Sequence, residues 1–179
     1  MYNSVEDTIG GYNSYLEKER KNDSIITTIL FDDQYEVLHY RKNVKEVKNL
    51  TSKEYFVRGS TALYDAIGKT INKLDSEKND EKVLFIITTD GEENSSVEYN
   101  RKDINKLIKK HNNWEFIFLG ANIDAYSEGA AIGIKKNRIS NFKKTKNGIK
   151  EVFKSVSYLK DCVACESRIE DSWKDNLEK

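Results

Sequence analysis

Apolar residues along the chain alternate between the spacing of helices and that of strands. In residues 5–20 they recur every three or four positions, which predicts an amphipathic helix. A β-branched run over 24–31 predicts a strand, and alternating residues over 35–40 predict a half-exposed strand beside it. Helical spacing returns over 61–74, and an uninterrupted apolar run over 82–88 predicts the next strand.

The alternation continues to the end of the chain. The predicted elements are a helix around 104–108, a strand over 114–119, a short helix over 125–132, a short strand over 138–142 and a long helix over 149–163. The uninterrupted apolar strands are expected to be buried on both faces, as the central strands of parallel sheets are. Helices alternating with such strands predict an α/β fold, a doubly wound and mostly parallel sheet with helices on both faces.

Charge and cysteine content narrow the classes of partner and the compartment. The 30 basic residues balance the 30 acidic ones, whereas a nucleic-acid-binding protein usually has a basic excess. No apolar stretch is long enough to predict a membrane span, so neither nucleic acid nor membrane is expected as a partner. The isolated pair Cys162 and Cys165 is interpreted as two reduced thiols. We therefore expect a cytoplasmic protein.

Candidate metal ligands lie where ligands bind in open parallel sheets, beyond the carboxyl ends of strands. Asp90 follows the strand over 82–88, Ser60 and Thr61 precede a helix, and Asp32 follows the first predicted strand. Each taken alone is more simply interpreted as a turn residue or a helix cap. Together, a hydroxyl and a carboxylate on neighbouring loops are hard oxygen ligands suited to Mg²⁺.

Two segments carry a family resemblance. Residues 58–67 (RGSTALYDAI) and 87–96 (ITTDGEENSS) closely resemble the second and third segments of the metal-ion-dependent adhesion site (MIDAS) of von Willebrand factor A (vWA) domains. The best match is to intracellular bacterial and phage-borne versions. That family holds its metal through a D-x-S-x-S loop, a threonine and an aspartate. The resemblance implies that Thr61 and Asp90 are metal ligands, with Mg²⁺ as the cofactor and Mn²⁺ or Ca²⁺ as alternatives.

The resemblance departs from the family at its start. The family's first strand and D-x-S-x-S loop have no counterpart, and residues 1–9 resemble the stretch that directly follows that loop. We therefore interpret 1–160 as an N-terminally truncated vWA-like domain and 161–179 as a C-terminal helical extension. The missing strand would be central, between 24–31 and 82–88. Its absence predicts weak or absent metal binding, and a chain that is marginal as a monomer, closes its sheet, or self-associates through exposed strand edges.

The expected function is protein–protein interaction without catalysis. In vWA domains a carboxylate from the partner completes the coordination of the metal, and the partner itself cannot be identified from this sequence. One alternative is a metal-dependent hydrolase or phosphoryl-transfer enzyme on a Rossmann-like sheet. A nucleotide-binding enzyme would need a G-x-G-x-x-G or Walker loop, and the glycines at 129–133 have the wrong spacing. The other alternative is a remnant domain that binds no metal.

Overall fold

The computed structural model describes residues 4–56, 59–77 and 81–179. The elements predicted from the sequence are present in the predicted order. They are α1 (Val5–Glu19), β1 (Ile25–Phe31), β2 (Tyr35–Asn43), α2 (Leu63–Asp75), β3 (Leu84–Thr89), α3 (Arg101–Lys110), β4 (Glu115–Gly120), α4 (Ala125–Ala131), β5 (Ile139–Asn141) and α5 (Lys146–Ala164). The structure also contains short 3-10 helices that the sequence did not predict, η2 (Val44–Glu46), η3 (Lys136–Arg138) and η4 (Asp171–Lys174).

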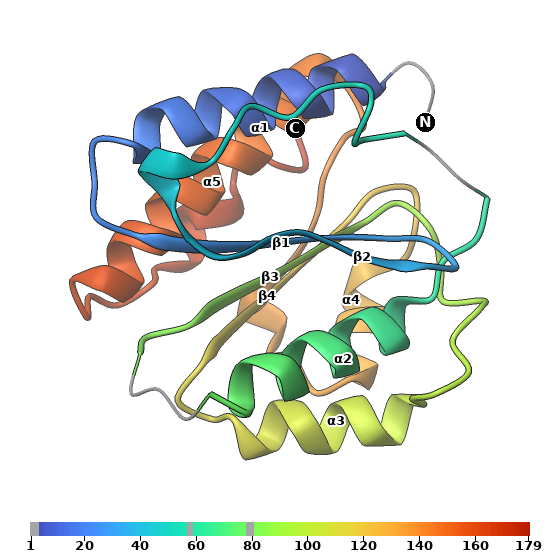
Figure 1. Ribbon diagram of the computed structural model, residues 1–179. Coiled ribbons are helices and arrows are strands. Elements are labelled where there is room, and N and C mark those ends of the chain that lie inside the picture. The colour runs from blue at the N-terminus through green and yellow to red at the C-terminus, as the bar shows by residue number, and fades with distance from the viewer. Residues whose placement is uncertain (1–3, 57–58, 78–80) are drawn as a thin grey trace.

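The strands form two separate sheets between two layers of helices. Strands β3, β4 and β5 form a parallel sheet in that order, and β1 and β2 form an antiparallel pair. Figure 1 shows α1 and α5 on one side of the strands and α2 and α3 on the other. The predicted α/β class, with helices on both faces, is confirmed.

Strand β4 is the centre of the hydrophobic core. Its alternate side chains enter different clusters: Phe116 and Phe118 pack with α2 and α3, while Ile117 and Leu119 pack with α5. All four are buried, as predicted for a central parallel strand. Fully burying such a side chain contributes roughly 1.5–3 kcal/mol, so β4 ties the two helical layers together.

Strand β3 is more exposed than the sequence predicted. Of its apolar residues, Ile87 is buried, but Leu84, Phe85 and Ile86 are only partly covered. The physical reason is that β3 pairs with β4 on one side and, within residues 4–56, 59–77 and 81–179, with no further strand on the other. Among the described residues, β1 pairs with β2 alone. Strands β1 and β3 thus belong to different sheets, and the central strand that the sequence predicted to be missing between them stays a prediction. Of the segment 1–9 used in that prediction, residues 1–3 lie outside the described residues.

The last residues of the chain pack into the core. The predicted boundary at 160 falls inside α5, which continues to Ala164. Beyond it, Ile169, Trp173 and Leu177 are buried in the same cluster as the β4 side chains that face α5. The Trp173 indole also donates a 2.9 Å hydrogen bond to the carbonyl of Asn137. This segment therefore covers one face of β4.

Helix α1 is joined to α5 by a buried ionic contact. The Glu19 side chain is 1% exposed, and its Oε2 lies 2.8 Å from Lys160 Nζ. Its Oε1 accepts a 3.2 Å hydrogen bond from Ser157. A second acceptor for the Lys160 ammonium is Asp161, also at 2.8 Å. Glu19 thus anchors the end of α1 on α5.

We expect Glu19→Ala to lower the free energy of unfolding by about 2 kcal/mol, less than the roughly 3–5 kcal/mol typical of broken buried pairs. The loss is smaller because Lys160 keeps Asp161 and is partly exposed. Urea unfolding measures the change. The matched control is Glu17→Ala on the same helix, whose side chain is 63% exposed, and its stability should be nearly unchanged. Equal losses in both variants would contradict the anchoring role of Glu19.

Candidate metal centre

The loop before α2 and the loop after β3 meet at the carboxyl edge of the strands. The Thr61 amide donates a 2.9 Å hydrogen bond to Asn94 Oδ1, and the Thr61 carbonyl accepts one of 3.0 Å from the Asn94 amide. The hydroxyl of Thr61 lies against Gly91, where a Cβ atom would come within 2.6 Å of it. Glycine after Asp90 therefore permits the close approach of the two loops, which brings the predicted ligands Thr61 and Asp90 together.

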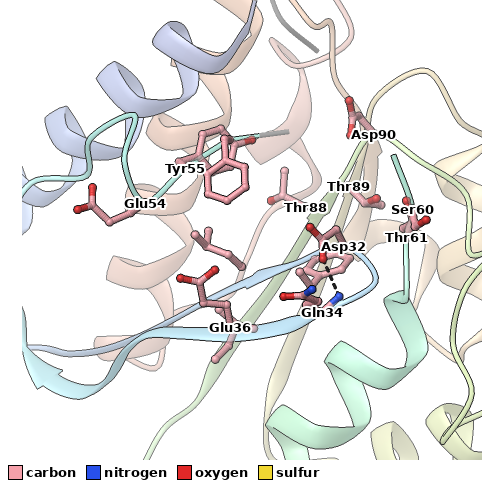
Figure 2. A pocket seen from close by; sticks show the side chains of 14 residues that line it. Asp32, Gln34, Glu36, Glu54, Tyr55, Ser60, Thr61, Thr88, Thr89 and Asp90 are labelled. Atoms are coloured by element: carbon pink, nitrogen blue, oxygen red, sulfur yellow. Dashed lines mark hydrogen bonds between the residues drawn. The ribbon is translucent and has the colours of Figure 1, made fainter. Parts of the chain in front are cut away.

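A cavity of about 160 Å³ opens between these loops and the end of β1. Ser60, Thr61 and Asp90 line it from one side, and Asp32 lines it from the end of β1. Figure 2 shows these side chains around the cavity, with Asp90 above Ser60 and Thr61. The carboxyl ends of β1 and β3 thus face one cavity, and all four residues named from the sequence border it.

Asp32, whose role the sequence left open, has a local contact in the turn after β1. Its Oδ1 accepts a 2.6 Å hydrogen bond from the Gln34 amide, shown dashed in Figure 2. Its carbonyl accepts one, also of 2.6 Å, from the Ala62 amide at the start of α2. Asp32 therefore links the β1–β2 turn to the Thr61 segment. Residues 57 and 58, at the start of the family-like segment, lie outside the described residues.

Glu93 anchors the Asp90 loop on the first turn of α2. Its Oε2 accepts a 3.0 Å hydrogen bond from the Tyr64 amide, at the helix start. Its Oε1 accepts hydrogen bonds from the amides of Ser95 (2.9 Å) and Ser96 (2.8 Å). A carboxylate at a helix N-terminus satisfies amides that have no partner in the helix and interacts favourably with the helix dipole. Glu93 was not predicted from the sequence, although an acidic loop after a strand is a signal that could have indicated it.

Asp65 holds the far end of the same loop. Its carboxylate accepts hydrogen bonds from three consecutive amides, those of Val97 (3.0 Å), Glu98 (2.9 Å) and Tyr99 (2.8 Å). Burial alone would raise the pKa of Asp65, but the three amides favour the ionised form, and the pKa is lowered from its ordinary value. Asp65 and Glu93 together fix the loop that carries Asp90.

Asp90 forms an ion pair with Lys144, which the sequence did not identify. Lys144 Nζ contacts Asp90 Oδ2, and the two side chains are 19% and 23% exposed. Lys144 lies in the segment between β5 and α5, directly before Thr145, whose hydroxyl caps α5 by accepting from the Gly148 amide. In the sequence this lysine belongs to a basic run that looks like an ordinary solvated surface.

The residues present do not by themselves form a metal centre. Thr61 and Asp90 offer one hydroxyl and one carboxylate, and that carboxylate already faces the Lys144 ammonium. No group of three or more His, Cys, Asp or Glu side chains within residues 4–56, 59–77 and 81–179 is placed to hold a metal ion. Mg²⁺ takes six oxygen ligands in near-ideal octahedral geometry, and the protein usually contributes carboxylates.

Both cysteines are free thiols, Cys162 buried and Cys165 exposed. Among the described helices, none is long and apolar enough to cross a membrane.

We expect Asp65→Asn to lower the free energy of unfolding by about 2 kcal/mol near neutral pH, because a carboxamide cannot accept hydrogen bonds from all three backbone amides. In the folded chain the pKa of Asp65 is lowered from its ordinary value of 3.8. The stabilisation by the ionised carboxylate is therefore present above the ordinary pKa and is lost as the pH falls through the folded pKa. The difference between variant and wild type should therefore shrink below about pH 4. Urea unfolding from pH 7 to pH 3 measures it.

The control is Asp75→Asn, at the other end of α2, where the carboxylate contacts Lys110 and His111. A carboxylate near a helix C-terminus gains nothing from the helix dipole, so this variant should change stability less. An Asp65→Asn variant as stable as wild type at neutral pH would show that the three amides do not fix the loop.

Comparisons with known proteins indicate the fold. No protein-family model matches the sequence, and no curated protein matches it either. Among solved structures, the chain is similar to proximal thread matrix protein 1 from the mussel byssus, described as having a zinc-occupied MIDAS motif. The TM-score is 0.60 at 13% identity, over 89% of this chain and 43% of that one, so this chain spans less than half of that protein's length. At such low identity the likeness shows the fold alone, which is vWA-like.

Proposed function

We propose that the chain is a protein–protein interaction module of the vWA type, whose partner binds at the carboxyl edge of the strands around Thr61 and Asp90. The observation that carries the proposal is the convergence of these two residues on one cavity. Their loops are joined by the Thr61–Asn94 hydrogen bonds and held by Glu93 and Asp65. A rigid, polar edge of this kind suits the recognition of a partner side chain.

The positions of the two histidines favour binding over catalysis. His111 follows α3 just before β4, at the amino edge of the sheet, where it lies 3.1 Å from Asp75. His39 lies in β2, with its ring nitrogen 3.5 Å from the Tyr12 hydroxyl. Neither histidine lines the cavity beside Asp90. A histidine base is therefore not placed at this cavity, and we propose that the chain is a binding module and not an enzyme.

The metal-dependent form of this contact is proposed to be impaired. In that form a partner carboxylate would complete the coordination of Mg²⁺ held by Thr61 and Asp90. The donor set falls short of what Mg²⁺ requires, and Lys144 faces the carboxylate. We therefore propose weak or absent binding of Mg²⁺, and a partner contact that does not depend on it.

We expect the wild-type chain to retain a protein partner from a lysate of the cells that make it, and Asp90→Ala to lose it. The substitution removes the charge at the proposed contact. Affinity capture with quantitative mass spectrometry, in Mg²⁺ and in EDTA, measures the retention. The control is Asp103→Ala, in the first turn of α3 and away from the cavity, which should retain the partner. Equal retention by wild type and Asp90→Ala would refute the proposed site, and turnover of a generic phosphate ester would favour an enzyme.

We further propose that an additional strand binds between β1 and β3, which belong to different sheets. Phe31 of β1 and Thr88 and Thr89 of β3 line the same cavity, and the two strands belong to different sheets. Backbone groups on such strand edges favour pairing with another chain. In the absence of an additional strand, a second copy of this chain can use the edges.

Self-association should therefore increase with protein concentration, as measured by sedimentation velocity. Thr88→Lys should weaken self-association, because a charged side chain at this exposed position of β3 opposes pairing of the strand with another chain. The control is Asn112→Lys, at an exposed residue before β4, and this variant should leave self-association unchanged. A chain that stays monomeric at all concentrations would argue against an open edge.

A further inference from the structure

We infer that Lys144 is the resident cation of the candidate metal centre. Its ammonium gives Asp90 the positive charge that a divalent ion would otherwise provide, from within the chain. This inference rests on the proposed function, in which a partner binds at the edge around Asp90. It deepens that proposal by naming the ion pair of Asp90 and Lys144 as the charged group that a partner meets there.

The first observation is the burial of the ion pair. Both side chains are less than a quarter exposed, so solvent and salt screen the attraction less than at an open surface. The ammonium contacts Oδ2 of Asp90, one of the two carboxylate oxygens that could bind a metal in the predicted centre. A divalent ion at that oxygen would be repelled by the ammonium and would have to displace it.

The second observation is that the backbone places Lys144 tightly. A Cβ atom at Gly148 would lie 1.9 Å from the carbonyl oxygen of Lys143, so the segment before α5 lies directly on the first turn of that helix. The Thr145 hydroxyl caps this turn with a 3.1 Å hydrogen bond from the Gly148 amide. The amide of Lys143 also donates a 3.3 Å hydrogen bond to the carbonyl of Leu177. The ammonium therefore extends from a fixed backbone.

The third observation is that the adjacent lysine makes a different contact. Lys143 Nζ donates to the carbonyl oxygen of Lys179 at the end of the chain, whereas Lys144 Nζ contacts Asp90. Two neighbouring lysines of identical chemistry thus have separate partners. This difference assigns the role to Lys144 and makes Lys143 a matched control.

Tyr55 lies near both members of the ion pair and lines the cavity beside Asp90. Burial raises the pKa of Tyr55, and a hydrogen bond with Thr8 lowers it. The charge of Asp90 also raises this pKa, and the charge of Lys144 lowers it, so the phenol lies within reach of both charges.

A double-mutant cycle tests the inference in the full chain without added metal. Lys144→Gln and Asp90→Asn should each lower the unfolding temperature by about 2–4 °C, and the double variant should lose little more than either single one. Lys143→Gln should leave it nearly unchanged, and Lys144→Arg should restore most of the loss because it keeps the charge. Additive losses in the double variant would overturn the inference.

Calorimetric titration with Mg²⁺ alone provides a second readout. Wild type and Lys143→Gln should bind Mg²⁺ at least about tenfold more weakly than Lys144→Gln, which exposes the carboxylate to the metal. Absence of binding in every variant would contradict the inference, because the ammonium would then not occupy the place of a metal ion. Wild type binding Mg²⁺ as tightly as Lys144→Gln would overturn it.

Neither measurement involves the partner, so the two proposals can fail separately. Additive losses would remove the role of Lys144 and leave the interaction module in place. Equal partner retention by wild type and Asp90→Ala would remove the proposed partner site and leave the ion pair intact.

Discussion

The candidate site depends on two carboxylates that hold one loop against one helix. Glu93 accepts hydrogen bonds from amides at the start of α2 and in its own loop. Asp65 accepts hydrogen bonds from three successive amides further along the chain. Each amide would otherwise need another partner, and a charged acceptor makes these bonds stronger than neutral ones. Because the loop is fixed at both points, Asp90 stays next to Thr61. The placement of the predicted ligands is therefore a consequence of acids that are themselves neither predicted ligands nor part of the cavity wall.

The candidate site and the separation between β1 and β3 lie at the same edge of the strands. The cavity that Thr61 and Asp90 border lies between the carboxyl ends of β1 and β3, the strands that are not joined. In an open parallel sheet, ligands bind beyond the ends of such strands. Whatever pairs with these edges would therefore also change the surroundings of the site.

Much of the fold could be predicted from the sequence because its periodicities are strong and local. The run over 114–119 predicted a strand buried on both faces, and β4 is that strand. The same pattern over 82–88 gave the correct strand, but its burial was overestimated because burial depends on a neighbour that the pattern does not contain. The meeting of Thr61 and Asp90 followed from their order on elements that end at one edge. Lys144 could not be found in this way, since it lies 54 positions from Asp90 in a lysine-rich segment.

Close backbone approach explains why charge at this edge can be set by a single side chain. Gly91 lets the Asp90 loop contact the Thr61 hydroxyl, and Gly148 lets the segment before α5 contact its own first helical turn. A Cβ atom at Gly148 would clash with the backbone carbonyl of Lys143, whereas one at Gly91 would clash with the side-chain hydroxyl of Thr61. As a result, Asp90 and the lysine facing it both extend from fixed backbone, and the ion pair has to order only their side chains. If Lys144 has the role that we infer, the vWA-like fold presents a defined polar edge at Asp90 without an ion from solution.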